Sequence, residues 1–256
     1  MGEVSVVSDV HAAFGALARV AATGRPLVVL GDFLNFIDYR TGEGMVADIL
    51  GLPFAREAGA ARGRGEDTRD LWVGAISRYE GDFRAALLAA AEAQYRAAAE
   101  ALGQAEAHVT FGNVDHPPLM RRVLPPTVRV HHGEVVDIAG LRFGFAGGGR
   151  RSPFGPVDEL SIEEALDALG PVDVLCTHVP PAAPTLYRDV ITGLDERHAA
   201  AIDDYVKTHR PRLHLFGDVH QPAATRWRVG ATRCHNVGYF RATGRPLVVD
   251  GGGRVC

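Results

Sequence analysis

The sequence contains very little cysteine and lysine. Its three cysteines, Cys176, Cys234 and Cys256, are too few and too scattered for a disulfide framework or a zinc site built from thiolates. The expected compartment is therefore a reducing cytoplasm. Lys207 is the only lysine among 27 basic residues, which we interpret as a compositional bias and not as a functional signal.

Long apolar runs and a strong net charge are also missing. The 27 basic residues face 31 acidic ones, and the net charge of −4 does not indicate nucleic acid as a partner. No run approaches the roughly 20 apolar residues that a membrane-spanning helix needs. No basic region precedes the apolar residues 4–7, so we expect neither an export signal nor a membrane partner.

The chain is long enough for one large domain, since 46% of its 256 residues are hydrophobic. Residues 3–8 and 27–30 have the pattern of strands, and residues 12–22 between them have that of a helix. This order is typical of an α/β sheet with parallel strands. Further strands are predicted at 108–111, 128–130, 135–138, 141–145, 172–176 and 213–216, and residues 223–249 are predicted to be all β.

Helices are predicted in three other places. Ser161 and Glu164 have the spacing of a capping box, and a helix is expected over 195–208. Residues from about 33 to 107 lack strand signals, and we interpret them as a helical insertion into a single domain spanning 1–256. Within it, residues 56–65 are rich in Gly, Ala and Arg and are predicted to be mobile. One apolar helix face, or two helices joined near Gly81, is predicted by residues at steps of three and four: Trp72, Ile76, Tyr79, Phe83, Leu87 and Ala90.

Polar residues follow five predicted strands directly at their carboxyl ends. Open α/β sheets place their functional sites at this edge, so we expect these side chains to converge. They comprise carboxylates, imidazoles and one amide, a mixture that suits paired Mn, Fe, Zn or Mg ions better than a structural zinc. The residues are Asp9, His11, Asp32, Asn113, Asp115, His178, Asp218 and His220.

The order of these residues resembles that of a known enzyme family. Asp9-Val10-His11, Gly31-Asp32, Gly112-Asn113, His178 and Gly217-Asp218-Val219-His220 look like the five blocks of the calcineurin-like metallophosphoesterases. Each block is weak alone, but their order over residues 9–220 is specific. The resemblance implies an α/β fold in which two mixed β-sheets pack as a sandwich flanked by helices.

The resemblance also implies a dinuclear metal site. Two ions about 3.5–4 Å apart would share a carboxylate and a bridging hydroxide that attacks a phosphate ester. The expected substrate is a small-molecule or nucleotide phosphate ester, with a phosphodiester preferred. A phosphomonoesterase and a non-catalytic protein-binding module with a degenerate site are the alternatives. One ion would bind Asp9, His11, Asp32 and His220, and the other would bind Asp32, Asn113, His178 and Asp218, with Asp32 as the bridge.

Two positions depart from the family pattern. Asp218 stands where the family has a histidine, and the additional oxygen ligand is expected to favour Mn or Mg over Zn. Val114 stands where many members have the histidine that protonates the leaving group. We predict that His116 takes over this role and that Asp115 orients it, beside Asn113.

Arginines near these blocks are candidates for binding the substrate phosphate. Arg40 lies shortly after Asp32, with Asp38 nearby, and an exposed ion pair is an equally good interpretation. Arg150 follows three glycines and could form an anion-binding loop, although an ordinary basic loop is the more common outcome.

Overall fold

The strands form two mixed sheets, as the sequence predicts. The computed structural model describes residues 2–149, 152–155, 159–191, 193–196 and 198–256. The first sheet has five strands in the order β11 (Leu247–Val249), β1 (Val4–Val7), β2 (Leu27–Val29), β3 (Ala107–Val109) and β4 (Val128–Val130). Strands β1 to β4 are parallel, and β11 is antiparallel to β1.

The second sheet has six strands. Their order is β5 (Glu134–Ile138), β6 (Leu141–Ala146), β7 (Val174–Thr177), β8 (Leu213–Phe216), β10 (Thr232–Asn236) and β9 (Arg226–Val229). The inner strands β6, β7, β8 and β10 are parallel, whereas β5 and β9 pair antiparallel at the two edges. The predicted class, an α/β sandwich of two mixed sheets, is confirmed.

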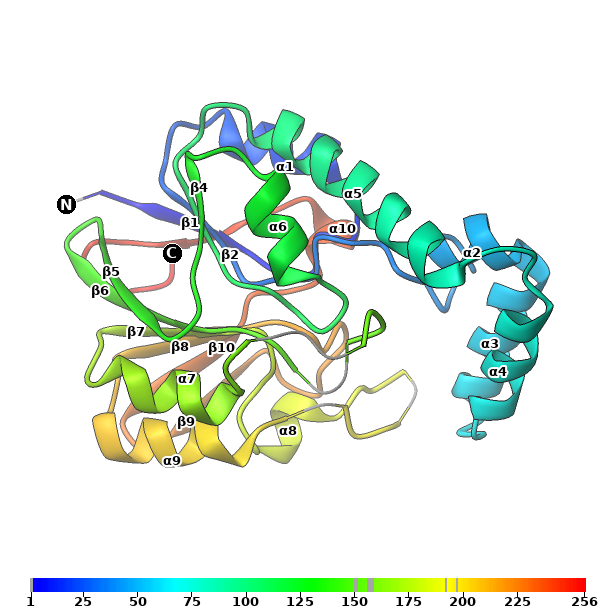
Figure 1. Ribbon diagram of the computed structural model, residues 1–256. Coiled ribbons are helices and arrows are strands. Elements are labelled where there is room, and N and C mark those ends of the chain that lie inside the picture. The colour runs from blue at the N-terminus through cyan, green and yellow to red at the C-terminus, as the bar shows by residue number, and fades with distance from the viewer. Residues whose placement is uncertain (1, 150–151, 156–158, 192, 197) are drawn as a thin grey trace.

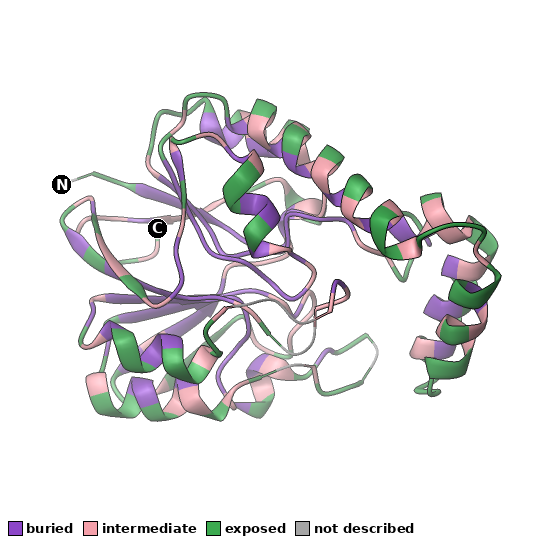
Figure 2. Cartoon of the chain, viewed as in Figure 1, coloured by how far each residue is buried: buried purple, intermediate pink, exposed green. Residues whose placement is uncertain are grey.

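The alternation of side chains along the strands builds the core. Val4 and Val6 of β1 point to the space between the sheets, where they meet Phe143 and Phe145 of β6. Val7 instead belongs to the core on the opposite face of its sheet. Both faces of each sheet are therefore covered, and the central strands are buried throughout (Figure 2).

Helices cover the outer face of each sheet (Figure 1). The first sheet is packed against α1 (Phe14–Ala21), α5 (Phe83–Leu102) and α6 (Pro117–Val123). The second is packed against α7 (Ile162–Leu169) and α9 (Ala200–His209). The predicted capping box at the start of α7 is present, with Ser161 and Glu164 bonding reciprocally. None of the described helices is long and apolar enough to cross a membrane.

The region between β2 and β3 contains α2 (Met45–Leu50), α3 (Leu52–Gly63), α4 (Arg69–Arg78) and α5. The break near Gly81 separates α4 from α5, as one of the two predicted alternatives requires. Helices α3 and α4 project beyond the sheets, whereas Leu87, Tyr95 and Leu102 of α5 lie in the core (Figure 1). The prediction of a mobile segment at 56–65 was wrong, because α3 extends to Gly63. Its alanines favour helix strongly enough to offset its glycines.

Short helices account for most other differences. Neither α6 nor α8 (Pro184–Tyr187) was predicted, and α9 begins at Ala200 instead of at residue 195. The tail is not all β, because α10 (Phe240–Thr243) precedes the last strand.

The two sheets approach each other closely at the carboxyl ends of β1 and β8. Gly217 follows β8 and lies against Ser8, and the backbone N–H of Asp218 donates to Asp9 Oδ2 at 3.1 Å. A Cβ atom on Gly217 would overlap the Ser8 hydroxyl and the Asp9 carboxylate. Glycine is therefore required here for space.

We predict that Gly217→Ala destabilises the protein by about 1–3 kcal/mol or more, because the new methyl group would overpack this contact. Urea unfolding measures the change. The matched control is Gly15→Ala in α1, where no atom of the described residues lies within 4 Å of the added carbon. Alanine at that exposed helical position should stabilise by up to about 1 kcal/mol. Equal stability of the two variants would contradict the close approach.

Candidate metal centre

The predicted metal ligands meet at one edge of the sandwich. Asp9 and His11 follow β1, Asp32 follows β2, and Asn113 follows β3 of the first sheet. His178 follows β7, and Asp218 and His220 follow β8 of the second sheet. The side chains from the two sheets contact each other across the gap between the strand ends.

One group of ligands surrounds the imidazole of His220. Its Nε2 lies 3.3 Å from Nε2 of His11 and 3.5 Å from Oδ1 of Asp9. Oδ2 of Asp32 lies 3.7 Å from Nε2 of His11. These are the four residues that the resemblance assigns to the first ion.

A second group surrounds His178. Its Nε2 lies 3.2 Å from Oδ1 of Asn113, 3.4 Å from Oδ1 of Asp32 and 3.5 Å from Oδ1 of Asp218. Asp32 thus presents one oxygen to each group, which is the position expected of a bridging carboxylate. Asp9 also lies between the groups, since its oxygens are within 4.8 Å of ligand atoms of both.

The ligand atoms are oriented so that they can bind cations. The Nδ1 atoms of His11 and His178 each donate to a backbone carbonyl at 2.9 Å, Leu34 O and Leu30 O respectively. These bonds fix the tautomer and leave the Nε2 lone pair facing the cluster, as in histidine metal sites. Oδ1 of Asp9 is buried and accepts no hydrogen bond from the described residues. The Asp and His groups could therefore hold a divalent metal ion.

The backbone is strained at the ligands. Positive φ angles occur at Asp9 (57°), His11 (40°), Asp32 (53°) and Asp218 (63°), a region that non-glycine residues rarely adopt. Strain of this kind concentrates at functional sites, where the surrounding structure enforces it. Here the positive φ angles turn the backbone sharply after each strand, so that the ligand side chains point into the cluster.

The cluster carries an excess of negative charge. Burial alone would raise the pKa of Asp32, but the charge and hydrogen bond of His178 outweigh it and hold this pKa well below its ordinary value. Burial would likewise lower the pKa of His178, yet Asp32 and Asp218 raise it well above its ordinary value. A bound divalent ion would neutralise the same charge, and His178 would bind it as the neutral imidazole.

Asp115 was predicted to orient His116, and the structure gives it different partners. Its Oδ2 accepts from the N–H of Asp32 (2.7 Å) and Gly112 (2.9 Å). Its Oδ1 accepts from the N–H of Phe33 and the hydroxyl of Tyr95, both at 3.1 Å. Burial, and then the charge of Asp32, raise the pKa of Asp115 to about 6. The carboxylate holds the loops after β2 and β3 together, which does not support the predicted role.

His116 lies at the start of α6. Its Nδ1 accepts from the N–H of Leu119 at 3.2 Å, and its ring packs edge-on against Phe154. The imidazole therefore serves as the helix cap. It is not among the described residues that line the cavity over the ligands, so this geometry does not support the predicted acid role.

A cavity of about 310 Å³ opens over the ligands. Arg40 lines it, together with Asp38, as expected for a residue that contacts substrate. Arg150, the other predicted substrate-binding residue, lies outside the described residues. The lining also includes Asp189, Ile191 and Glu196, and Arg62 of α3 bonds both oxygens of Glu196 at 3.0 and 3.1 Å. The insertion thus contributes part of the lining of the cavity over the ligands.

Sequence reasoning missed two residues beside the ligands. The ring of Tyr239 stacks on His220, with centroids 3.8 Å apart and an interplanar angle of 6°. Arg241 donates to the backbone oxygen of His11 and lies 3.7 Å from Asp38. Both follow β10, where a glycine and aromatic residues after a buried strand were the available signal.

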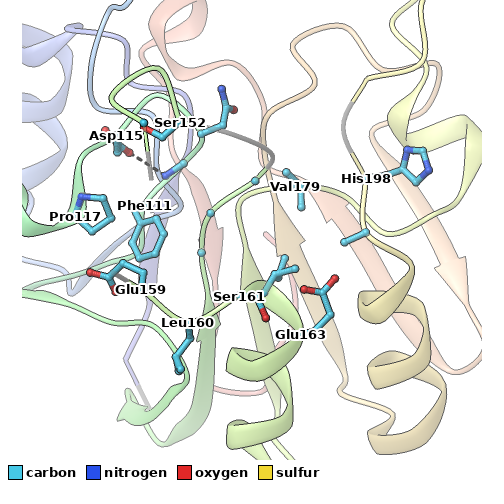
Figure 3. A pocket seen from close by; sticks show the side chains of 18 of the residues that line it. Phe111, Asp115, Pro117, Ser152, Glu159, Leu160, Ser161, Glu163, Val179 and His198 are labelled. Carbon is cyan, nitrogen blue, oxygen red and sulfur yellow. Dashed lines mark hydrogen bonds between the residues drawn. The ribbon is translucent and has the colours of Figure 1, made fainter. Parts of the chain in front are cut away.

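A larger hollow of about 910 Å³ adjoins the cluster. Figure 3 shows Phe111, Asp115 and Pro117 on one side of it and His198 on the other. Asn113 lines this hollow as well as the smaller cavity, so it is the proposed ligand at which the two adjoin.

No family model matches the chain, and no curated protein matches it either. One crystal structure aligns with all of this chain and 98% of its own, at 19% identity and a TM-score of 0.62. TT1561 of Thermus thermophilus aligns over 100% and 97%, at 14% identity and a TM-score of 0.55. A candidate 5'-nucleotidase from Staphylococcus aureus reaches a TM-score of only 0.47, at 13% identity over 99% of this chain and 52% of its own. At these identities the comparisons establish a relationship of fold alone.

The bonds around Tyr95 generate a stability prediction. Its buried hydroxyl donates to Asp115 and accepts from the backbone N–H of His116 at 2.9 Å. We expect Tyr95→Phe to lower the free energy of unfolding by about 1–3 kcal/mol, because a buried donor and acceptor lose their partner. Chemical denaturation measures the loss.

The control is Tyr79→Phe, a half-exposed tyrosine of the same insertion whose ring packs edge-on against Phe83. That variant should keep nearly the stability of the wild type. If Tyr95→Phe also left the free energy of unfolding unchanged, Asp115 would not depend on α5 for its position.

Proposed function

We propose that this protein is a metal-dependent phosphoesterase with two divalent ions, and that it hydrolyses phosphodiesters in preference to monoesters. The observation that carries the proposal is the position of Asp32, whose two oxygens face His11 and His178 at 3.7 and 3.4 Å. A carboxylate placed between two sets of ligands is the arrangement that a dinuclear centre needs.

The proposed ligands are Asp9, His11, Asp32 and His220 for one ion, and Asp32, Asn113, His178 and Asp218 for the other. Bound there, two divalent ions would activate a water at neutral pH and neutralise charge on the phosphoryl group. The protein would hold the imidazoles in one tautomer through Leu34 O and Leu30 O, and the insertion would limit the access of bulk water.

The charges around the cavity support a diester. Arg62 is paired with Glu196, which leaves Arg40 as the arginine of the described lining that is outside this pair. A phosphodiester carries one negative charge, whereas a monoester near neutral pH carries up to two. A cavity that offers one such arginine suits the smaller charge better.

A protein-binding module with a degenerate site is the second candidate. Val114 and Asp218 favour it, because both depart from the family pattern. The clustered Asp and His side chains argue against it, since buried carboxylates that have lost their cation would be costly to keep.

We predict that the protein hydrolyses bis(4-nitrophenyl) phosphate faster than 4-nitrophenyl phosphate, and that Mn or Mg supports the reaction better than Zn. The extra oxygen donor of Asp218 is the reason for the metal preference. Initial rates across a panel of divalent ions measure both preferences. A faster monoesterase, or a reaction that is fastest with Zn, would contradict the corresponding half of the prediction.

Asp32→Ala should lower kcat/KM roughly 10³-fold or more, because it would remove the ligand shared by both ions. Asp137→Ala changes an exposed aspartate of β5 and should leave the rate unchanged. Activity that survives in Asp32→Ala, or that needs no divalent ion, would rule out the dinuclear mechanism.

A further inference from the structure

The cavity over the metal ligands has apolar residues in its lining that the chemistry of phosphate does not explain. The lining includes Phe36, Ile37, Ile191 and Tyr239 in addition to the polar ligands. A phosphoryl group needs cations and hydrogen-bond donors, and the metal ligands of the same lining would hold the cations. The apolar residues can contact only another part of the substrate.

The wall from the insertion side is built firmly. Phe36 stacks on Trp72 of α4, with centroids 6.0 Å apart and an interplanar angle of 15°. Phe54 of α3 packs edge-on against the same Trp72 at 5.0 Å. The projecting helices therefore support the apolar wall.

A second segment of the lining carries Ile191, which is 73% exposed although it is large and apolar. Its backbone is held in place, because its N–H donates to Oδ1 of Asp189 at 2.8 Å. The preceding N–H, of Val190, donates at 2.9 Å to the backbone oxygen of Gln221, which directly follows His220. This segment is thus bonded to the strand end that supplies two ligands.

An ion pair joins the insertion to this second segment of the lining. Arg62 bonds both oxygens of Glu196, and its guanidinium lies 4.9 Å from the ring centre of Tyr39. These three residues line the cavity, whose volume is about 310 Å³. Small-molecule sites begin at roughly 300 Å³, so this cavity is near the lower end of their range. The volume fits one compact organic group beside the phosphate.

We infer that Phe36, Ile37 and Ile191 form a specificity pocket for a compact apolar group of the substrate, such as a phenyl ring attached to the phosphorus through oxygen. The inference rests on the proposed function for its phosphate end. It assigns to the insertion the role of selecting small aryl or alkyl phosphodiesters over esters with polar or bulky groups.

The test compares two diesters with the same leaving group, 4-nitrophenyl phenyl phosphate and 4-nitrophenyl methyl phosphate, on the full chain with Mn²⁺. The wild type should prefer the phenyl ester by about tenfold or more in kcat/KM, since each buried methylene contributes about fourfold. Ile191→Ala should reduce this preference about three- to tenfold. Val190→Ala is the matched control, because Val190 is adjacent, is 58% exposed and is not among the described residues that line the cavity.

Binding provides a readout that is independent of turnover. Calorimetry with phenylphosphonate and methylphosphonate should show tighter binding of the phenyl compound, with the same dependence on Ile191 and the same indifference to Val190. If neither diester is hydrolysed but this binding pattern holds, the proposed reaction fails and the pocket stands. If both diesters are hydrolysed equally, or neither phosphonate binds more tightly than the other, the pocket is overturned.

Discussion

The close approach of the two sheets at their carboxyl ends is the constraint on which the rest of the structure depends. Gly217 allows the end of β8 to lie against Ser8 and Asp9 of the other sheet, and within the first sheet a Cβ on Gly112 would overlap the Asp32 carboxylate. Without side chains at these points, ligands separated by two hundred residues reach hydrogen-bonding distance of one another. The positive φ angles at Asp9, Asp32 and Asp218 are the conformational cost of this convergence.

The close approach of the sheets also brings negative charges together. Carboxylates from both sheets are buried together, and Asp32 and Asp218 raise the pKa of His178 between them well above its ordinary value. Asp115 limits the remaining freedom by bonding to backbone N–H groups of the loops after β2 and β3, and Tyr95 extends that support into α5. The insertion therefore does more than cover the site, since its last helix helps to position the ligand loops.

Much of this arrangement could be predicted because it follows from local pattern. Strand-end polar residues such as Asp32 and His178 are visible in sequence, and the alternation of apolar strands and helices indicates the α/β class. The roles of Asp115 and His116 could not be predicted in this way. Asp115 depends on Tyr95, a partner that only the packing of α5 brings near, and His116 caps α6, a helix that the sequence did not predict. The helix at 52–63 was missed because its glycines weakened the helical pattern of its alanines. The stacking of Tyr239 on His220 was missed because it is a tertiary contact.

The central claim is that Asp32 joins two cation sites in one cluster. Titration calorimetry of the chelator-treated protein with Mn²⁺ tests it most directly. The account predicts two ions bound per chain with release of protons, and a loss of at least one of them in Asp32→Asn. A single ion in the wild type, or unchanged stoichiometry and affinity in that variant, would contradict it.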